Sequence, residues 1–416
     1  MAQLSDDCFA FGGPLLSVDD CAALVRARIQ PSMGKETVPL AKADGRILAH
    51  DLVAGIPLPP FDNSAVDGYA LHHADLSCHG DTLLPLGGRI AAGMAADAMP
   101  PGHAMRIFTG APMPAGADTV FMQEDVVLKD GHVRLPLGLE RGANRRLAGE
   151  DIAVGAVALP GGRRLGPAEL ALAAALGAGS LTVRKRLTIG VFSTGDELTE
   201  PWQTLHEASI HDANRPMLCA MAARAGADVL DLGILRDQAQ PLAEALVRAA
   251  ARCDLVLTSG GVSAGEEDHV KTAVESVGAL TFWRIAIKPG RPVAMGVVRG
   301  VPFVGLPGNP VAAMVTFAFV VRPLVAQLGG AEAPRPCRIP VRAGFAYVKK
   351  ARRREYVRVS LMPDANGMLV AQKYTRDGAG VITSMTATDG LVELADDMMT
   401  LQPGDLVPFL SWKELM

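Results

Sequence analysis

Several classes of protein are excluded by what this sequence lacks. Its six cysteines are scattered over 416 residues and include no Cys-x-x-Cys pair, so we expect no disulfide framework, no structural zinc site and a reducing compartment. Basic residues (40 Lys and Arg) do not outnumber acidic ones (44 Asp and Glu), and the net charge is -4. That balance excludes a strongly basic nucleic-acid binder or a protein held at an anionic membrane.

Long apolar runs and an export signal are also missing. The most apolar stretch, residues 310–321, ends at Arg322, and we expect it to be too short to cross a bilayer. Residues 1–14 lack the basic start and apolar run of a signal peptide. These features predict a cytoplasmic protein with neither a membrane nor a nucleic acid as partner.

The composition is that of a globular protein of several domains. Hydrophobic residues make up 49% and charged residues 20% of the chain, which is enough to bury a sizeable core. At roughly 100–200 residues each, two to four domains are expected.

The N-terminal part predicts a helical domain that is split in the sequence. A first helix is predicted at 17–30, capped by Ser17, and helical character returns at 150–184, most strongly at 167–176. We therefore predict one discontinuous domain from residues 14–52 and 150–184.

Between these halves, residues 53–149 predict an inserted β domain. Prolines and glycines recur there and separate short apolar runs such as 119–122 and 132–135. Short strands joined by tight turns give this pattern.

Residues 185–330 predict a doubly wound α/β domain with a parallel sheet. Apolar strand-like runs at 187–192, 228–232 and 254–258 alternate with helical segments at 214–225, 240–252 and about 268–277. Asn214 is expected to cap the first of these helices. Residues 331–416 return to short strands and predict a small C-terminal β domain.

Ligands of an open α/β sheet bind beyond the carboxyl ends of its strands. Directly after the first predicted strand stands Ser193-Thr194-Gly195-Asp196-Glu197. Small residues let the backbone approach a ligand, and the two acids suit a divalent cation. The alternative, a turn whose acids cap the next helix, is about equally plausible from these residues alone.

A second segment, TSGGVS at 258–263, follows another predicted strand. Its consecutive small residues offer free N–H groups to a phosphate. The acids of GEEDH at 265–269 return to the same edge, and acids beside a phosphate site indicate a bridging metal ion.

A third region comprises KPGRP at 288–292 and GLPGNP at 305–310. Lys288 and Arg291 flank a rigid Pro-Gly turn, an arrangement suited to an oxyanion or phosphate. For the second stretch, a plain loop leading into a helix at Pro310 is the simpler interpretation.

Together these segments resemble the pterin-binding domain of the molybdopterin molybdenumtransferases, the family of MoeA and the gephyrin E domain. Further motifs of that family stand in the predicted insert and after it. They are PFDNSAVDGYA at 60–70, FTGAP at 108–112, MQE at 122–124 and GED at 149–151. Motifs in the family's order span residues 60–390, most of the chain.

The resemblance implies a fold, an assembly and a reaction. The fold is a β domain inserted in an elongated first domain, the α/β domain, and a small C-terminal β domain. The assembly is a head-to-tail homodimer, in which the pterin domain of one subunit faces the Asp67 and Thr109 loops of the other. The reaction inserts molybdenum from molybdate into adenylylated molybdopterin with Mg²⁺ and releases AMP, and a carboxylate, Glu197 or Asp67, would orient the attacking oxygen. Implied partners are the molybdopterin adenylyltransferase and recipient molybdoenzymes or their chaperones.

The resemblance also assigns residues by role. Catalytic roles fall to Asp67, Glu197, Asp237, Asp268 and Lys288, and metal binding to Asp196, Glu197 and Asp268. Substrate contacts fall to Thr109, Asp151, Thr194, Gly195, Asp196, Ser259, Gly260, Gly261, Val262, Ser263, Arg284, Pro289, Gly290, Arg291, Pro307 and Arg358.

The sequence departs from the family pattern at three places. Val66 replaces a methionine, His269 a tyrosine, and Ala379 a serine whose hydroxyl would add a hydrogen bond of about 0.5–1.5 kcal/mol. Two basic clusters have no role in these motifs. We interpret KKARRR at 349–354 as a charged edge strand. Arg145-Arg146 is either a solvated pair or a substrate contact.

Two other functions compete with the transferase. A pterin adenylyltransferase shares the α/β domain but needs no β insert. A molybdopterin-binding scaffold or carrier on the same fold would have no need of the acids at Asp67, Asp196 and Glu197.

Overall fold

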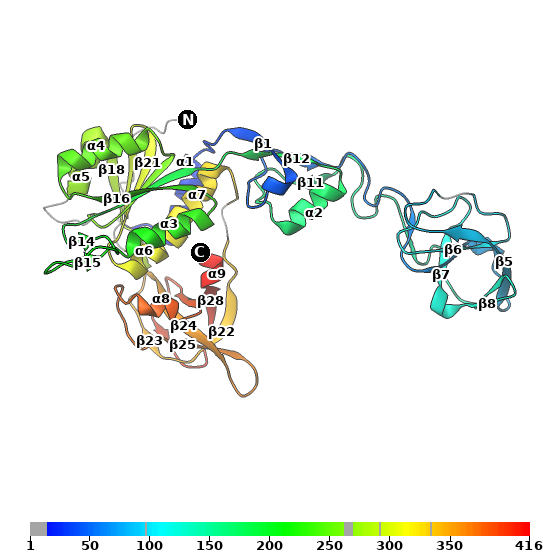
Figure 1. Cartoon of the computed structure of the whole chain (residues 1–416). Helices are drawn as coiled ribbons and strands as arrows, with labels where there is room; N and C mark the ends of the chain where they lie inside the picture. Colours follow the sequence, from blue (N-terminus) through cyan, green and yellow to red (C-terminus); the bar gives the residue numbers. More distant parts are fainter. Residues whose placement is uncertain (1–14, 96–97, 262–268, 291–292, 333–334) are drawn as a thin grey trace.

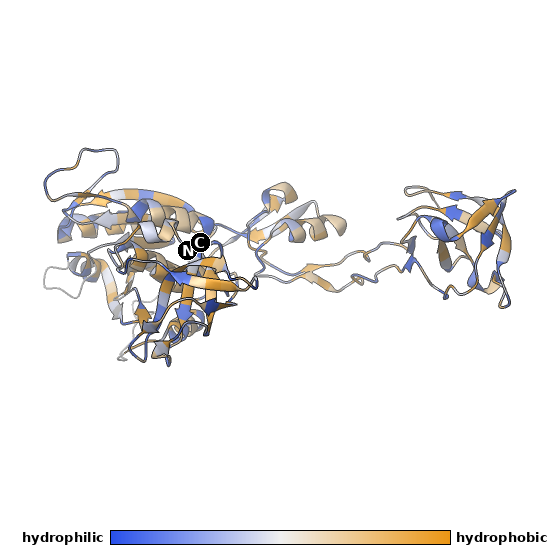
Figure 2. Ribbon diagram, turned by 90° about the horizontal axis from the view of Figure 1, so that it is seen from below, coloured by the Kyte–Doolittle hydropathy of each residue, from blue (hydrophilic) through white to orange (hydrophobic). Residues whose placement is uncertain are grey.

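The protein is elongated, with folded regions at both ends of a thin arm (Figure 1). The computed structural model describes residues 15–95, 98–261, 269–290, 293–332 and 335–416. One end holds the α/β sheet and the C-terminal β sheet, and the other end holds the β insert (Figures 1 and 2). Residues of the two ends are therefore far apart within one chain.

The α/β region is built on a six-stranded sheet in the order β16-β13-β17-β21-β20-β18. Its strands are β13 (Thr188–Thr194), β16 (Asp228–Leu235), β17 (Leu255–Ser259), β18 (Gly278–Trp283), β20 (Val293–Val298) and β21 (Val301–Leu306). The pairs among β16, β13, β17 and β21 are parallel, while β20 runs antiparallel to both of its neighbours. The predicted parallel sheet is thus confirmed for four strands and carries an antiparallel edge.

Helices cover both faces of this sheet, as expected for a doubly wound fold. One core cluster packs α1 (Val18–Arg28) and α3 (Asn214–Arg224) against the sheet, and another packs α4 (Ala239–Ala250) and α5 (His269–Val277). The strands read as almost continuous apolar runs because they are buried on both sides. A short pair, β14 (Leu198–Thr199) and β15 (Ile210–His211), projects beside the sheet.

Residues 310–329 form one continuous helix, which corrects the expectation that this stretch ends at Arg322. It consists of α6 (Pro310–Thr316), a π-helical turn (Phe317–Val321) and α7 (Arg322–Gly329). Arg322 N–H bonds to the carbonyl of Phe317, so the chain passes into α7 although Pro323 lacks an N–H. By length and composition this helix could cross a membrane, but 83% of its most apolar window is buried inside the protein. It packs in the core of the α/β region.

The arm carries two strand pairs and a helix. β1 (Lys35–Pro39) pairs with β12 (Ser180–Arg184), and β2 (Leu52–Val53) with β11 (Val157–Leu159). The 3-10 helix Leu40–Lys42 and α2 (Pro167–Ala175) complete it around a small apolar core.

The insert is a six-stranded sheet in the order β7-β4-β6-β5-β9-β8, with a separate pair of β3 (Asn63–Ser64) and β10 (Arg145–Arg146). The sheet comprises β4 (Gly68–Leu71), β5 (Thr82–Ile90), β6 (Ala104–Ile107), β7 (Thr119–Met122), β8 (Val127–Lys129) and β9 (His132–Leu135). Short 3-10 turns follow β4 and β7, at His73–Asp75 and Gln123–Asp125. The short strands and tight turns expected for 53–149 are present.

The C-terminal sheet closes on itself and is joined by a strand from the α/β region. Its order is β19-β24-β25-β22-β28-β26, and β26 also pairs with β24. The strands are β19 (Ile287–Lys288), β22 (Ile339–Ala343), β24 (Arg354–Pro363), β25 (Leu369–Lys373), β26 (Gly390–Leu394) and β28 (Leu406–Ser411). A second pair, β23 (Tyr347–Val348) and β27 (Thr400–Leu401), and helices α8 (Thr383–Thr386) and α9 (Trp412–Leu415) flank it. Residues 349–353 lie between β23 and β24, so the predicted edge strand at 349–354 is wrong except for its last residue.

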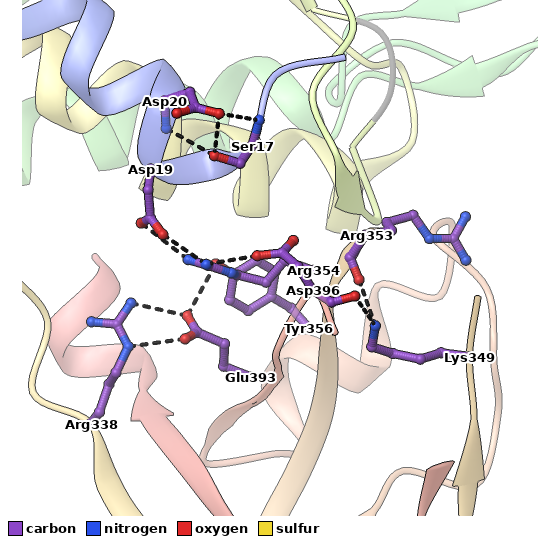
Figure 3. A network of polar contacts seen from close by, with 10 residues as sticks. All are labelled: Ser17, Asp19, Asp20, Arg338, Lys349, Arg353, Arg354, Tyr356, Glu393 and Asp396. Carbon is purple, nitrogen blue, oxygen red and sulfur yellow. Dashed lines mark hydrogen bonds and ion pairs between the residues drawn. The ribbon is translucent and has the colours of Figure 1, made fainter. Parts of the chain in front are cut away.

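A network of hydrogen bonds and ion pairs connects this sheet to α1 (Figure 3). Arg354 donates to Asp19 of α1 and to Asp396, at 2.8 Å each. Ser17 caps α1 as expected, and Asp20 completes a capping box. The contacts hold the C-terminal sheet beside the edge of the α/β sheet.

Candidate functional site

The segments after β13, β17 and β21 lie at one edge of the α/β sheet. Ser193 pairs with Ser259, and Ser259 pairs with Leu306, so the three carboxyl ends are level. The Gly260 N–H donates to the Leu306 carbonyl at 3.2 Å. The prediction that the segments beginning at Ser193 and Thr258 stand at strand ends is confirmed.

Buried polar atoms without partners gather at this edge. Such atoms are rare in folded proteins, and each needs an explanation. Eight side-chain atoms among the described residues are buried without a hydrogen-bond partner. Six belong to residues at or beside the edge: Ser193, Thr194, Asn214, Asp237, Thr258 and Thr316. This concentration indicates a surface that is completed by a polar ligand.

The glycine turn after β17 is packed too tightly for any side chain. Gly260 and Gly261 have φ angles of 89° and 64°, a region that favours glycine. A Cβ at Gly260 would lie 2.7 Å from the Thr194 carbonyl oxygen, and one at Gly261 2.7 Å from Thr194 Cγ2. Both glycines are needed to bring this turn against the end of β13.

Asn214 is a site residue that the sequence analysis interpreted wrongly as a helix cap. It is the first residue of α3, and its Nδ2 donates to Ser259 Oγ and to the Gly308 carbonyl, both at 2.7 Å. Ser259 Oγ in turn donates to the Pro307 carbonyl at 3.3 Å. Asn214 therefore ties two ligand-facing loops together, a role that no local sequence pattern distinguishes from capping.

The charges of Asp196 and Glu197 affect a third carboxylate, that of Asp237, near the glycine turn. Burial raises the pKa of Asp237, and the charges of Asp196 and Glu197 add to this increase, while His269 and Thr194 oppose it. Asp196 and Glu197 are exposed, and the chain after them forms β14 rather than a helix, so they do not cap a helix.

The chemistry of these acids fits a hard cation. Carboxylate oxygens are the ligands that Mg²⁺ prefers, and Asp237 Oδ1 is buried without a partner. No three His, Cys, Asp or Glu side chains form a metal-holding group within the described part of the chain. Asp268 lies outside the described residues, as do Val262, Ser263 and Arg291.

On the other side of the site, Lys288 is held by a buried carboxylate. Its Nζ donates to Glu355 Oε2 at 2.9 Å and to the Tyr347 hydroxyl at 3.2 Å. Burial disfavours the charged form of Lys288, but these two hydrogen bonds outweigh burial and raise its pKa. Lys288 therefore stays positively charged.

A cavity of about 420 Å³ joins this lysine to the C-terminal sheet. Its lining includes Lys288, Pro289, Gly290, Pro307, Asn309, Tyr347, Glu355, Arg358, Lys373 and Ala379. Arg358 Nη1 donates to the Gly378 carbonyl at 2.7 Å, and burial lowers the pKa of Arg358. The structure thus brings Arg358 into one cavity with Pro307 and Asn309, and its assigned role stays a prediction.

Arg284 follows β18 directly and is exposed at the same end of the sheet. Tyr347, Glu355 and Lys373 are cavity residues that the sequence analysis missed. They lie on β23, β24 and β25, and the pairing of β19 with β24 sets Glu355 opposite Lys288.

The insert carries a second group of assigned residues. Asp67 Oδ1 accepts hydrogen bonds from the Thr109 N–H and hydroxyl, both at 2.8 Å. The Thr109 N–H, followed by its hydroxyl, lowers the pKa of Asp67. Arg106 lies 4.8 Å from the ring centroid of Phe108, next to this pair. Within one chain this group lies at the far end of the arm from the α/β edge (Figure 1).

Three residues singled out in the sequence remain to be placed: Asp151, Arg145 and Ala379. Asp151 is exposed and its N–H donates to the Leu58 carbonyl at 3.0 Å. Arg145 pairs with Asp62 within the insert, which favours a structural role for it. The Ala379 carbonyl accepts from the Val311 N–H at 3.0 Å, so the backbone of this residue contacts α6 without a hydroxyl.

Comparisons with known proteins point to the same family over most of the chain. Three family models match: the MoeA N-terminal region (domain I and II) at 16–177, a probable molybdopterin binding domain at 190–327, and the MoeA C-terminal region (domain IV) at 340–412. The chain is 35% identical over 404 residues to a molybdopterin molybdenumtransferase of Haemophilus influenzae, covering 97% of this chain and 100% of the relative. It is 35% identical to molybdopterin molybdenumtransferase 2 of Mycobacterium tuberculosis (88% and 93% covered). The solved structure of a molybdopterin biosynthesis MoeA protein from Pyrococcus horikoshii superposes with a TM-score of 0.81 at 27% identity, covering 96% and 100% of the two chains.

Proposed function

Because this chain belongs to the MoeA family of molybdopterin molybdenumtransferases, we propose that it inserts molybdenum from molybdate into adenylylated molybdopterin and releases AMP. The observation that carries the proposal is the edge of the α/β sheet. Unpartnered polar atoms and a glycine turn stand there beside three carboxylates, with the cations of the neighbouring cavity opposite.

Charge explains why such a site is needed. Molybdate is a dianion and the adenylylated pterin carries a diphosphate, so the two repel in water. Lys288, Arg358 and Arg284 attract the anions, and the backbone of the turn at Gly260 and Gly261 binds the phosphate. Charges fixed before the substrates bind need no reorganisation during the reaction.

The carboxylates serve metal binding and the cleavage of the phosphoanhydride. Asp196, Glu197 and Asp237, with Asp268, would hold Mg²⁺, which neutralises charge on the diphosphate when bound. Glu197 or Asp67 orients the oxygen that attacks the phosphoanhydride. AMP leaves as that bond breaks. The two dithiolene thiols then bind molybdenum, and the oxo group they displace leaves as water with the two thiol protons.

We further propose that the working unit is a head-to-tail homodimer in the cytoplasm. Asp67, Thr109 and Asp151 have assigned roles. Thr109, which binds Asp67, closely follows β6, and β6 lies at the far end of the arm from the α/β sheet (Figure 1). A second subunit would bring its insert to this edge. The division of the chain into domains at 14–52 with 150–184, 53–149, 185–330 and 331–416 is part of the same proposal. The adenylyltransferase that supplies the substrate and the molybdoenzymes or chaperones that take the product are the proposed partners.

The test is a purified-component assay with adenylylated molybdopterin, molybdate and Mg²⁺. AMP release should require molybdate and should accompany activation of an apo-molybdoenzyme. Glu197→Gln should abolish both, while Glu244→Gln, a neutralised exposed glutamate on α4, should leave them unchanged. Tight binding of the pterin without AMP release would contradict the proposal and would identify a scaffold or carrier.

A further inference from the structure

A second, strongly cationic cavity lies at the junction of the arm and the α/β region. Its volume is about 990 Å³, and it is lined from α1, α3, the 310–329 helix and residues 161–164 of the arm. None of the residues that line it lines the cavity at Lys288. It is therefore separate from the candidate transferase site.

The lining of this cavity is unusually rich in arginine. Six of its residues are arginines and one is a glutamate, Glu332: the arginines are Arg26, Arg163, Arg164, Arg224, Arg322 and Arg335. The whole chain has a net charge of -4, so this concentration of positive charge is local. Arginine presents a planar fork of N–H donors that matches phosphate and carboxylate oxygens.

The guanidinium groups are largely without acidic partners. Arg163 forms a salt bridge with Glu169, but the other five form none with a carboxylate side chain of the described residues. Arg164 donates to the carbonyls of Gly45 and Ala225, at 2.9 and 2.8 Å, and Arg322 to the carbonyl of Glu414. These bonds fix both side chains, and neither guanidinium forms a salt bridge within the described residues.

Neighbouring cations make this excess of charge costly. Burial lowers the pKa of Arg164, and Arg186 lowers it further. Burial also lowers the pKa of Arg322; Glu414 opposes this shift and Arg164 adds to it. Arg164 is exposed and Arg322 is half-buried, so both charges are partly solvated, but neighbouring like charges still repel one another unless an anion compensates them.

The backbone is shaped to hold this arrangement. Gly226, with φ of 93°, leaves room for Arg164, because a Cβ there would lie 2.5 Å from Arg164 Nη1. Gly162, with φ of 84°, lies against the Gly330 carbonyl, which a Cβ would approach to 3.2 Å. The approach of the arm to α3 and α7 thus depends on residues that have no side chain.

We propose that this cavity binds a small anion that carries a chain of two or more phosphates. Five guanidiniums that form no salt bridge among the described residues line one cavity, and they exceed what a single phosphate can engage, since each offers five N–H donors. The volume lies at the upper end of the range for small-molecule sites, which favours a compact ligand over a nucleic acid. The proposal goes beyond the transferase reaction and does not depend on it.

Binding of tripolyphosphate to the full-length protein tests the proposal by calorimetry without added Mg²⁺. The double change Arg164→Gln, Arg322→Gln should weaken binding by about tenfold or more, because it removes two charge-assisted contacts. Arg248→Gln, on an exposed arginine of α4, should leave binding unchanged. Orthophosphate should bind at least about tenfold more weakly than tripolyphosphate.

A second experiment identifies which molecule carries the polyphosphate chain. ATP and tripolyphosphate are compared on the parent protein: tighter binding of ATP identifies a nucleotide, and equal binding an inorganic chain. Hydrogen exchange on the parent protein gives a readout that does not rely on the variants folding. Added tripolyphosphate should protect amides in 161–164, 224–226 and 326–331.

Three results would overturn the proposal. They are tripolyphosphate affinity unchanged by the double variant, affinity lost with Lys288→Gln instead, or protection confined to the glycine turn after β17. Loss of AMP release in the transferase assay with intact tripolyphosphate binding would refute the proposed function alone.

Discussion

The buried carboxylate behind Lys288 offers the sharpest test of how the site is held. The Glu355 side chain is 1% exposed and accepts from Lys288 Nζ and the Tyr347 hydroxyl, at 2.9 Å each, and from Arg353. Glu355→Gln keeps the shape but removes the charge, so that two cations face a neutral amide. Breaking a buried pair costs about 3–5 kcal/mol. Lys288 is 49% exposed and can turn to water, so we expect a loss of about 2–3 kcal/mol in the free energy of unfolding.

The loss should depend on pH in a definite direction. Burial favours the neutral form of Glu355, but the hydrogen bonds from Lys288, Arg353 and Tyr347 outweigh burial and lower its pKa. Its charged form therefore stabilises the fold above the ordinary glutamate pKa, and this contribution disappears as the pH falls through the lowered value. The parent and Glu355→Gln should differ most near neutral pH and converge in acid.

Urea unfolding followed by tryptophan fluorescence measures this difference, since Trp412, in the same region, and Trp283 are both buried. Asp81→Asn is the matched control, because the Asp81–Arg134 pair is exposed (39% and 64%) and should be worth only about 0–1 kcal/mol. Equal stability of Glu355→Gln and the parent at pH 7 would refute the reasoning, as would a difference that persists unchanged at pH 3.

Three further changes probe the edge of the α/β sheet and the insert. Asp237→Asn should raise the unfolding midpoint at pH 7 and not in acid, because burial raises the pKa of Asp237 and its charge is unfavourable above that pKa; an unchanged midpoint at pH 7 would contradict this. Gly260→Ala should abolish pterin binding in a fluorescence titration and cost about 1–3 kcal/mol, since its Cβ would meet the Thr194 carbonyl at 2.7 Å; full binding would show that the turn is not needed. Asp67→Asn should lower AMP release while leaving the exposed loop folded, as circular dichroism would verify; unaltered release would remove Asp67 from the site.

Local sequence patterns predicted the elements better than their connections. The strand at 187–192 was recognisable because burial on both faces leaves an apolar, partly β-branched run, and β13 (Thr188–Thr194) confirms it. Ser17 as a cap followed from its position before two acids. The length of the 310–329 helix did not follow, because a charged residue at 322 resembles an end when its burial is unknown.

The loops of the site were predictable and their supports were not. Asp196 and Gly260 closely follow strands of the parallel sheet, where ligand-binding residues collect. Lys288 lies on β19, which pairs with β24 of the C-terminal sheet. Asn214, Tyr347 and Glu355 reach the site through tertiary packing, and no spacing in the sequence connects them to Ser259 or Lys288. The distance between Asp67 and Glu197 along the arm was equally invisible.

The central claim, that two subunits complete one transferase site, is tested most directly by a mixed dimer. Asp67→Asn and Glu197→Gln chains with different tags are co-expressed, and the heterodimer is isolated and assayed for molybdate-dependent AMP release. Each variant homodimer should be inactive. In the heterodimer one site carries both changes and the other none, so it should release AMP at about half the parent rate. A heterodimer as inactive as the two homodimers would contradict the account.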